Sequence, residues 1–121
     1  MLLAYDDPIG ATAAFNLNLL ARINRELGGD FDLRRFRHQA RFHEEKGRVE
    51  MHLLSEADQT VEIPGAGIAV SFREGETIWT ESSHKYSLAD VQDMAADTGY
   101  GCVAQWVDQE WPFAQNLFKV A

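Results

Sequence analysis

The sequence has few of the features that fix a fold or a catalytic site by themselves. Its one cysteine, Cys102, cannot form an intramolecular disulfide, and there is no second thiol for a cysteine-based metal site. We therefore expect Cys102 to be a small buried hydrophobic residue. No apolar run approaches the ~20 residues that span a bilayer, and no basic region followed by an apolar segment marks a signal peptide. We expect a protein of the reducing cytoplasm.

Positive charge is also scarce. The chain has 11 Lys and Arg against 19 Asp and Glu, which gives a net charge of −8 and a pI of about 4.8. Such a field repels phosphate backbones and anionic lipids, so we expect neither nucleic acid nor a membrane as a partner. The 121 residues have the size of one domain, and the 45% of hydrophobic residues could fill a core.

Self-contained catalytic motifs are missing. The sequence has no GxSxG, no HExxH and no GxxxxGK[ST]. The histidines are not paired at helical metal-ligand spacing; His43 and His52 could be neighbours across a hairpin, but we favour surface positions over a metal site. The glycines of "GAG", residues 65–67, lie between two predicted strands, so they do not form a dinucleotide-binding loop.

The first third of the chain has a helical pattern. Asp7 is a suitable N-cap, Pro8 fits a first helical turn, and Gly28 is a typical end. Apolar residues recur at helical spacing over a wide stripe, so we expect this helix to be well buried. Asp32 then caps a short helical turn.

A period of two replaces the helical period after this. In "RVEMHLL", Val49, Met51 and Leu53 alternate with Glu50 and His52, which predicts a strand with one buried face. The surrounding region has the same alternation, broken by turn residues, and predicts an antiparallel meander over 41–81.

The last part returns to a helix. Ser87 followed by Asp90 predicts a capped helix that ends at Gly99, and "CVAQWV" and "FAQNLFKV" predict two further strands. The predicted fold class is therefore α+β: an N-terminal helix with an antiparallel sheet, followed by a helix and a strand pair.

One joint, "TIWTESSHKYSL" at residues 77–88, is rich in polar groups. Regular alternation places Thr77, Trp79 and Glu81 on one face, with Glu81 closing the strand and Ser83 two residues later. A carboxylate and a hydroxyl pointing the same way could hold a planar ring with two nitrogens. The alternative is a solvated Glu81 and a turn-capping Ser83, which the spacing alone favours.

Three longer strings carry a resemblance: "AYDDPIGATAAFNLNLLARINRELGGDFD", "RVEMHL" and "TESSHKY". They resemble the C-terminal part of the histidine-specific, S-adenosylmethionine-dependent methyltransferase family over nearly the whole chain. The resemblance implies that residues 1–86 form a substrate-binding region. Residues 87–121 would be the last helix and closing strands of a class I, Rossmann-like methyltransferase domain. The family's cofactor-binding half has no counterpart in this sequence.

The same resemblance implies a pocket for L-histidine or a similar amino acid, formed by Tyr5, Thr12, Phe15, Met51, Glu81 and Ser83. Tyr5 is expected at the carboxylate of the ligand, with Thr12 and Phe15 near its α-amino group. Met51 is expected in an apolar wall, and Glu81 and Ser83 at the imidazole ring. Two of these residues have plainer interpretations, because Tyr5 could be a surface residue and Met51 a core residue.

The resemblance also limits what this chain is expected to do. The whole family enzyme uses S-adenosylmethionine, and we expect this chain alone to bind no cofactor and to methylate nothing. Methyl transfer from a sulfonium is a direct displacement that depends on orientation, so we assign no catalytic residue. The alternatives are a stand-alone amino-acid-binding module and a subunit that completes a methyltransferase. Uncovered apolar surfaces predict self-association or a missing N-terminal methyltransferase half.

Overall fold

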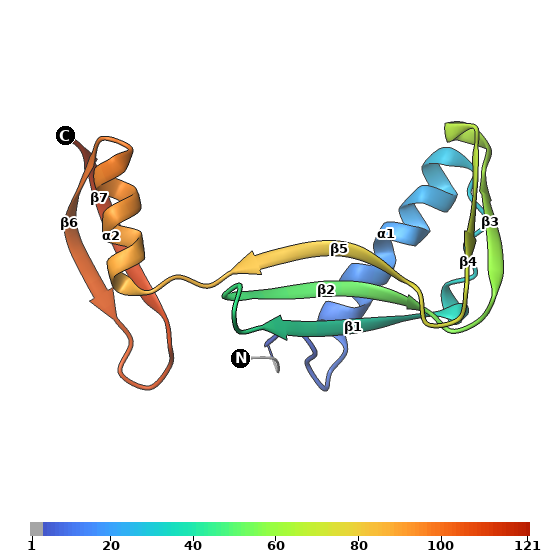
Figure 1. Ribbon diagram of the computed structural model, residues 1–121, viewed down its shortest axis with the longest axis horizontal. Coiled ribbons are helices and arrows are strands. Elements are labelled where there is room, and N and C mark those ends of the chain that lie inside the picture. The colour runs from blue at the N-terminus through green and yellow to red at the C-terminus, as the bar shows by residue number, and fades with distance from the viewer. Residues whose placement is uncertain (1–3) are drawn as a thin grey trace. The chain divides into compact units, whose positions relative to one another are not determined.

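The structure is a computed structural model that describes residues 4–121 (Figure 1). The chain folds into two compact units. Unit 1 ends at His84, and unit 2 begins at Lys85. The mixture of two α-helices with antiparallel sheets confirms the α+β class. Within residues 4–121, neither helix is both long and apolar enough to cross a membrane.

Unit 1 combines one long helix with two antiparallel sheets. Its elements are α1 (Ala11–Leu27), η2 (Leu33–Arg35), β1 (Phe36–His43), β2 (Arg48–Ser55), β3 (Gln59–Ile63), η3 (Pro64–Ala66), β4 (Ile68–Phe72) and β5 (Thr77–His84). The first sheet has the order β1-β2-β5, and β3 pairs with β4 alone. The predicted antiparallel pairing is confirmed, but a single meander is wrong, because β5 returns to pair with β2.

The helix α1 begins later than the sequence predicts. Gly10, at φ +81°, is the N-cap residue, so Pro8 lies outside the helix. Asp7 still caps it, because its carboxylate accepts hydrogen bonds from the backbone N–H groups of Ala11 and Thr12 at 3.1 and 3.0 Å. These bonds, chiefly those from Thr12, lower the pKa of Asp7 to about 2.

The helix α1 packs against β1 and β2, and it also contacts η2, β3 and η3 (Figure 1). Asn16 and Leu20 are its buried residues. Phe15 is 69% exposed, and Ile9 just before the helix is 93% exposed. The prediction of a well-buried helix is therefore wrong: the pattern shows which face can be buried, and the described residues of unit 1 leave Phe15 largely exposed.

The core of unit 1 lies between α1 and the sheets. It is a cluster of Leu20, Phe31, Phe36, Leu53, Val61 and Ile63. Each such side chain contributes about 1.5–3 kcal/mol by leaving water. Gly65 docks the β3–β4 hairpin on the end of α1, because a Cβ there would lie 2.6 Å from the carbonyl oxygen of Leu27.

The strand β2 is buried on both faces, so the predicted single buried face is wrong. Glu50 is 4% exposed and His52 is 5% exposed. His52 Nδ1 and Thr77 Oγ1 share a hydrogen bond of 3.1 Å. The His52 ring also stacks on the Trp79 ring, with the ring centroids 6.0 Å apart. Polar residues occupy this face because partners on β2 itself and on the neighbouring strands β1 and β5 satisfy them.

The register between β2 and β5 changes by one residue. Met51 pairs with Glu81, but the next residue, His52, pairs with Trp79, which leaves Thr80 as an extra residue in β5. Such an irregularity is a β-bulge. Two expectations are therefore wrong: Trp79 and Glu81 do not share a face, and Glu81 does not close the strand, which continues to His84.

Unit 2 consists of α2 (Leu88–Asp97), β6 (Tyr100–Val107) and β7 (Ala114–Val120), with β6 and β7 antiparallel. The predicted cap is confirmed: Ser87 and Asp90 form a reciprocal capping box. Cys102 is exposed, so its predicted burial is wrong. One helix cannot cover both faces of a two-stranded sheet.

Candidate functional site

Four of the six predicted ligand-binding residues come together on the side of the β1-β2-β5 sheet that faces α1. Val49, Met51 and Leu53 face this side, and Leu53 joins the core with Leu20. Cross-strand partners share a face, so Ser83, opposite Val49, and Glu81, opposite Met51, face it as well.

A hydrogen bond between Tyr5 and Ser83 brings residues from near the two ends of unit 1 into this cluster. The Tyr5 hydroxyl and the Ser83 hydroxyl are 2.8 Å apart and share a hydrogen bond. Met51 is 5% exposed and forms an apolar floor, while Glu81 is exposed and accessible to a ligand. The arrangement therefore offers a carboxylate and two hydroxyls above a thioether.

The other two predicted residues lie on the first turns of α1. The Thr12 N–H donates to Asp7, and its hydroxyl donates to the carbonyl of Ala4 at 3.5 Å. Phe15 is largely exposed, so in this structure it is not a packed wall. Thr12 is thus engaged within its own segment.

Two buried polar residues that the sequence did not single out support Tyr5. The side-chain nitrogen of Asn16 donates to His38 Nδ1 at 3.0 Å and to the His52 carbonyl at 3.2 Å. Because His38 Nδ1 accepts, its Nε2–H is the donor to the Tyr5 carbonyl at 2.6 Å. A signal for this pair existed, since Asn16 interrupts the apolar stripe of α1 four residues before Leu20.

The opposite face of the sheet has a second polar cluster. Glu50 Oε2 accepts from His43 Nε2 at 3.1 Å and from His52 Nε2 at 2.9 Å, and Arg48 binds Glu50 Oε1 at 2.6 Å. The hydrogen bond from His52, followed by that from Arg48, lowers the pKa of Glu50 to about 2 against the opposing effect of burial.

This second cluster is an ion-pair network. Its members are engaged with one another, and among residues 4–121 no group of three or more His, Cys, Asp and Glu is arranged to hold a metal ion. The predicted surface position is wrong for His38 and His52, which are 7% and 5% exposed, whereas the side chain of His43 is 43% exposed.

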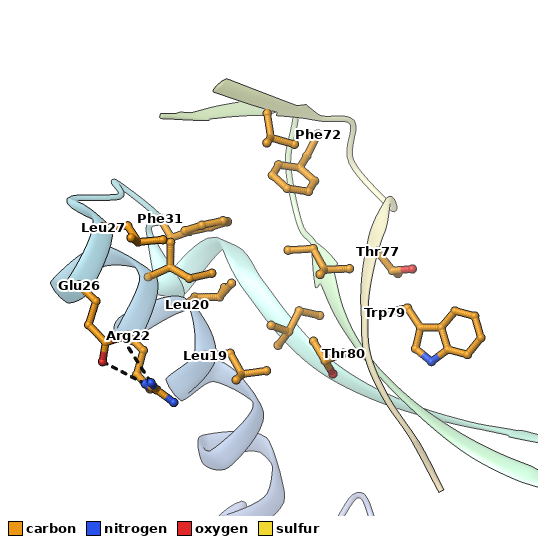
Figure 2. A pocket seen from close by; sticks show the side chains of 14 residues that line it. Leu19, Leu20, Arg22, Glu26, Leu27, Phe31, Phe72, Thr77, Trp79 and Thr80 are labelled. Carbon is orange, nitrogen blue, oxygen red and sulfur yellow. Dashed lines mark hydrogen bonds and ion pairs between the residues drawn. The ribbon is translucent and has the colours of Figure 1, made fainter. Parts of the chain in front are cut away.

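A groove of about 650 Å³ lies at the other end of α1 (Figure 2). Apolar side chains of α1, β4 and β5 line it, including Leu19, Ile23 and Phe72, with the Arg22–Glu26 ion pair among them. None of the six predicted ligand-binding residues lines this groove. An apolar groove cannot select a zwitterionic amino acid, whereas the Tyr5–Glu81–Ser83 cluster has the polar groups to do so.

The described residues do not fit S-adenosylmethionine. A class I methyltransferase holds this cofactor at a glycine-containing turn between a strand and a helix. Here the glycine-rich turn at 65–67 joins β3 to β4, and Gly65 is packed on Leu27. We therefore derive no methyl-transfer step through the residues of this chain.

Comparison with known proteins gives consistent results. The model of a family described as "Histidine-specific methyltransferase, SAM-dependent" matches residues 1–120. The histidine N-alpha-methyltransferase of Mycolicibacterium smegmatis is 40% identical over 114 residues, which cover 94% of this chain and 36% of that protein. The protein of the same description from Mycobacterium tuberculosis has the same identity and coverage. The chain therefore spans about a third of the length of the curated relatives it matches.

Proposed function

Because the chain belongs to the histidine-specific, SAM-dependent methyltransferase family, we propose that it supplies the imidazole-binding side of an L-histidine pocket and helps present the α-amine for methylation. The observation that best supports this is the position of Glu81 and Ser83 on the same face as Tyr5, with the two hydroxyls 2.8 Å apart.

The proposed roles follow from the chemistry of each group. The Glu81 carboxylate accepts an N–H from the imidazole ring, and its charge favours the protonated ring. The Ser83 hydroxyl can accept from or donate to the second ring nitrogen. Met51 packs below the ring, and Tyr5 donates its phenolic O–H to the ligand carboxylate.

Ligand entry requires one rearrangement. The proposed roles give the two hydroxyls different partners, the ligand carboxylate for Tyr5 and a ring nitrogen for Ser83, so a bound histidine separates them. They are 2.8 Å apart here. The Tyr5 side chain therefore swings away when histidine enters, while His38 keeps hold of the Tyr5 carbonyl. Thr12 and Phe15, in the first and second turns of α1, are proposed to lie on the side that the α-amino group enters.

Methylation itself belongs to the assembled family enzyme. S-adenosylmethionine supplies the methyl group there, and the residues of this chain orient the amine for it. An alternative function is a stand-alone amino-acid-binding or interaction module without catalysis. The misfit between S-adenosylmethionine and the described residues favours this alternative if no partner provides the cofactor site.

The test is a graft. The 114 corresponding residues of the M. smegmatis relative are replaced by this chain, and the graft is assayed with L-histidine. Glu81→Gln removes the charge at constant shape, and we expect KM for histidine to rise about 10–100-fold, since a hydrogen bond to a charged group contributes about 1.5–3 kcal/mol. Glu45→Gln, in the exposed turn between β1 and β2, is the matched control and leaves KM unchanged.

Two further measurements separate the alternatives. Calorimetric titration of this chain alone with L-histidine tests the binding module, with L-leucine as the control ligand. A graft that methylates histidine equally well with and without the Glu81→Gln substitution would contradict the assignment of this carboxylate. Histidine binding by the isolated chain, without any activity in the graft, would favour the binding module.

A further inference from the structure

The bulge in β5 decides which face of the sheet Glu81 occupies. In a regular strand, side chains alternate, so residues two apart lie on the same face. Trp79 and Glu81 are two apart, yet their cross-strand partners are the consecutive residues His52 and Met51. They therefore lie on opposite faces, because Thr80 is an extra residue between them.

The side chains follow this division. Figure 2 shows the Trp79 ring on the side of β5 away from α1 and Thr80 on the side toward α1. Trp79 stacks on His52, and the Arg48 guanidinium lies 4.7 Å from the centre of its ring. Glu81 and then Ser83 point to the Tyr5 side. Without the extra residue at this place, either Trp79 or the Glu81–Ser83 pair would be on the wrong face.

Two side chains hold the irregular backbone. The Thr80 hydroxyl donates to the Met51 carbonyl across the strands at 3.0 Å, at the point where the regular ladder is interrupted. On the other face, Trp79 Nε1–H donates to the Glu81 carbonyl at 3.1 Å. The Thr80 bond is the one that crosses from β5 to β2, and it ties the bulge to Met51, the floor of the candidate site.

We propose that Thr80 is a positioning residue: through its hydroxyl bond to Met51 it fixes the bulge that turns Glu81 and Ser83 toward Tyr5, and so it determines selectivity for an amino acid with an imidazole side chain. This inference rests on the proposed function, because it assumes that Glu81 and Ser83 bind the ring. Thr80 itself does not touch the ligand.

The test compares Thr80→Val with Thr80→Ser in the graft described above. Valine keeps the shape of threonine and removes the donor, so the Met51 carbonyl loses its partner. We expect KM for histidine to rise about 5–10-fold with kcat and KM for S-adenosylmethionine unchanged within twofold, as for the loss of one neutral hydrogen bond. Serine keeps the hydroxyl and restores KM to within twofold of the parent. Thr60→Val, which removes the hydroxyl bond of 2.9 Å to Ser71 in the β3–β4 hairpin, is the control for losing a strand hydroxyl elsewhere.

Register can be measured without activity. In nuclear Overhauser spectra of the 121-residue chain, the Met51–Glu81 backbone contact marks the bulged register, and we expect it to weaken in Thr80→Val and to persist in Thr80→Ser. An unchanged KM for histidine in Thr80→Val, while Glu81→Gln still raises it, overturns the inference and leaves the proposed function standing. Equal rises in the KM of both substrates, with a lower unfolding temperature, show a general structural role and also overturn it. If Glu81→Gln has no effect either, the proposed function fails, and the inference fails with it.

Discussion

Unit 1 buries six hydrophobic residues in one cluster, whereas Ala95 is the buried hydrophobic residue among those described in unit 2. Unit 2 instead exposes large apolar side chains, among them Trp106 at 57%, Trp111 at 70% and Phe113 at 59%. Both units follow their sequence patterns of helix and strand. The difference is that unit 1 has elements on both sides of its core, and unit 2 has a single helix for a single hairpin.

The polar groups differ in the same way. Unit 1 contains buried polar side chains whose bonds connect distant segments, as in the link from Asn16 through His38 to Tyr5. In unit 2 the polar bonds are of shorter range: the Ser87–Asp90 capping box, the bonds of Asp108 to the next turn, and a bond of 2.7 Å from Gln105 to Asn116 between the paired strands β6 and β7. Such bonds shape a helix, a turn or one hairpin, and they do not connect segments that are distant in the sequence. We propose that unit 2 completes its core against another surface, either the methyltransferase half of a whole enzyme or a second copy.

The largest expected difference between the two units is in their stability when each is made as a separate peptide. We expect residues 1–84 to unfold cooperatively on heating, because their core is internal, and residues 85–121 to show no cooperative transition, because a helix and one hairpin are marginal alone. Circular dichroism melting curves of the two peptides decide it. A sharp transition in the isolated unit 2, at concentrations where sedimentation shows a monomer, would contradict the proposal.

A matched pair of leucine truncations gives the next largest effect. Leu53→Ala removes a side chain with no exposed surface in unit 1 and should cost about 2–5 kcal/mol of unfolding free energy. Leu117→Ala removes one that is 50% exposed in unit 2 and should cost less than about 1 kcal/mol. Urea unfolding followed by residue-resolved NMR measures both. Equal costs would mean that Leu117 is buried in solution, as self-association would produce.

The smallest expected effect is on the pH dependence. Glu50 has a folded-state pKa of about 2, below its ordinary value of 4.5. The ionised carboxylate therefore contributes stability that is present above about pH 4.5 and is lost as the pH falls toward 2. We expect Glu50→Gln to make the fall in unit 1 stability over this range shallower, as measured by urea midpoints at several pH values. Glu45→Gln should leave the slope as it is in the parent, and a parent-like slope in Glu50→Gln would remove Glu50 as its cause.

The sequence predicts the elements well because their signals are local. The 3.6-residue and two-residue periods identify α1, β2 and α2, and the Ser87–Asp90 pair predicts the start of α2. The sequence does not predict how these elements are covered. An apolar stripe on α1 looks the same whether or not a partner covers Phe15. The burial of Glu50 depends on covering strands as well as on its neighbours Arg48 and His52, and only those neighbours are visible in the local sequence.

The sequence likewise predicts only part of the candidate site. The resemblance singled out Met51, Glu81 and Ser83, but the strand pattern put Glu81 on the same face as Trp79. One unpaired residue in β5 reverses that placement, and the string "TIWTES" has no local mark of it. His38 and Asn16 were not predicted because their role depends on a meeting of three distant segments.

The bond between Tyr5 and Ser83 has a consequence for the order of folding. It joins residues 78 positions apart, which is nearly the whole of unit 1. Closing so long a loop costs entropy that only the prior formation of α1 and the sheet can reduce, so this contact belongs to the last steps of folding. By the same reasoning it belongs to the first steps of unfolding. We therefore expect the candidate site to open at a lower free energy than the core beneath it.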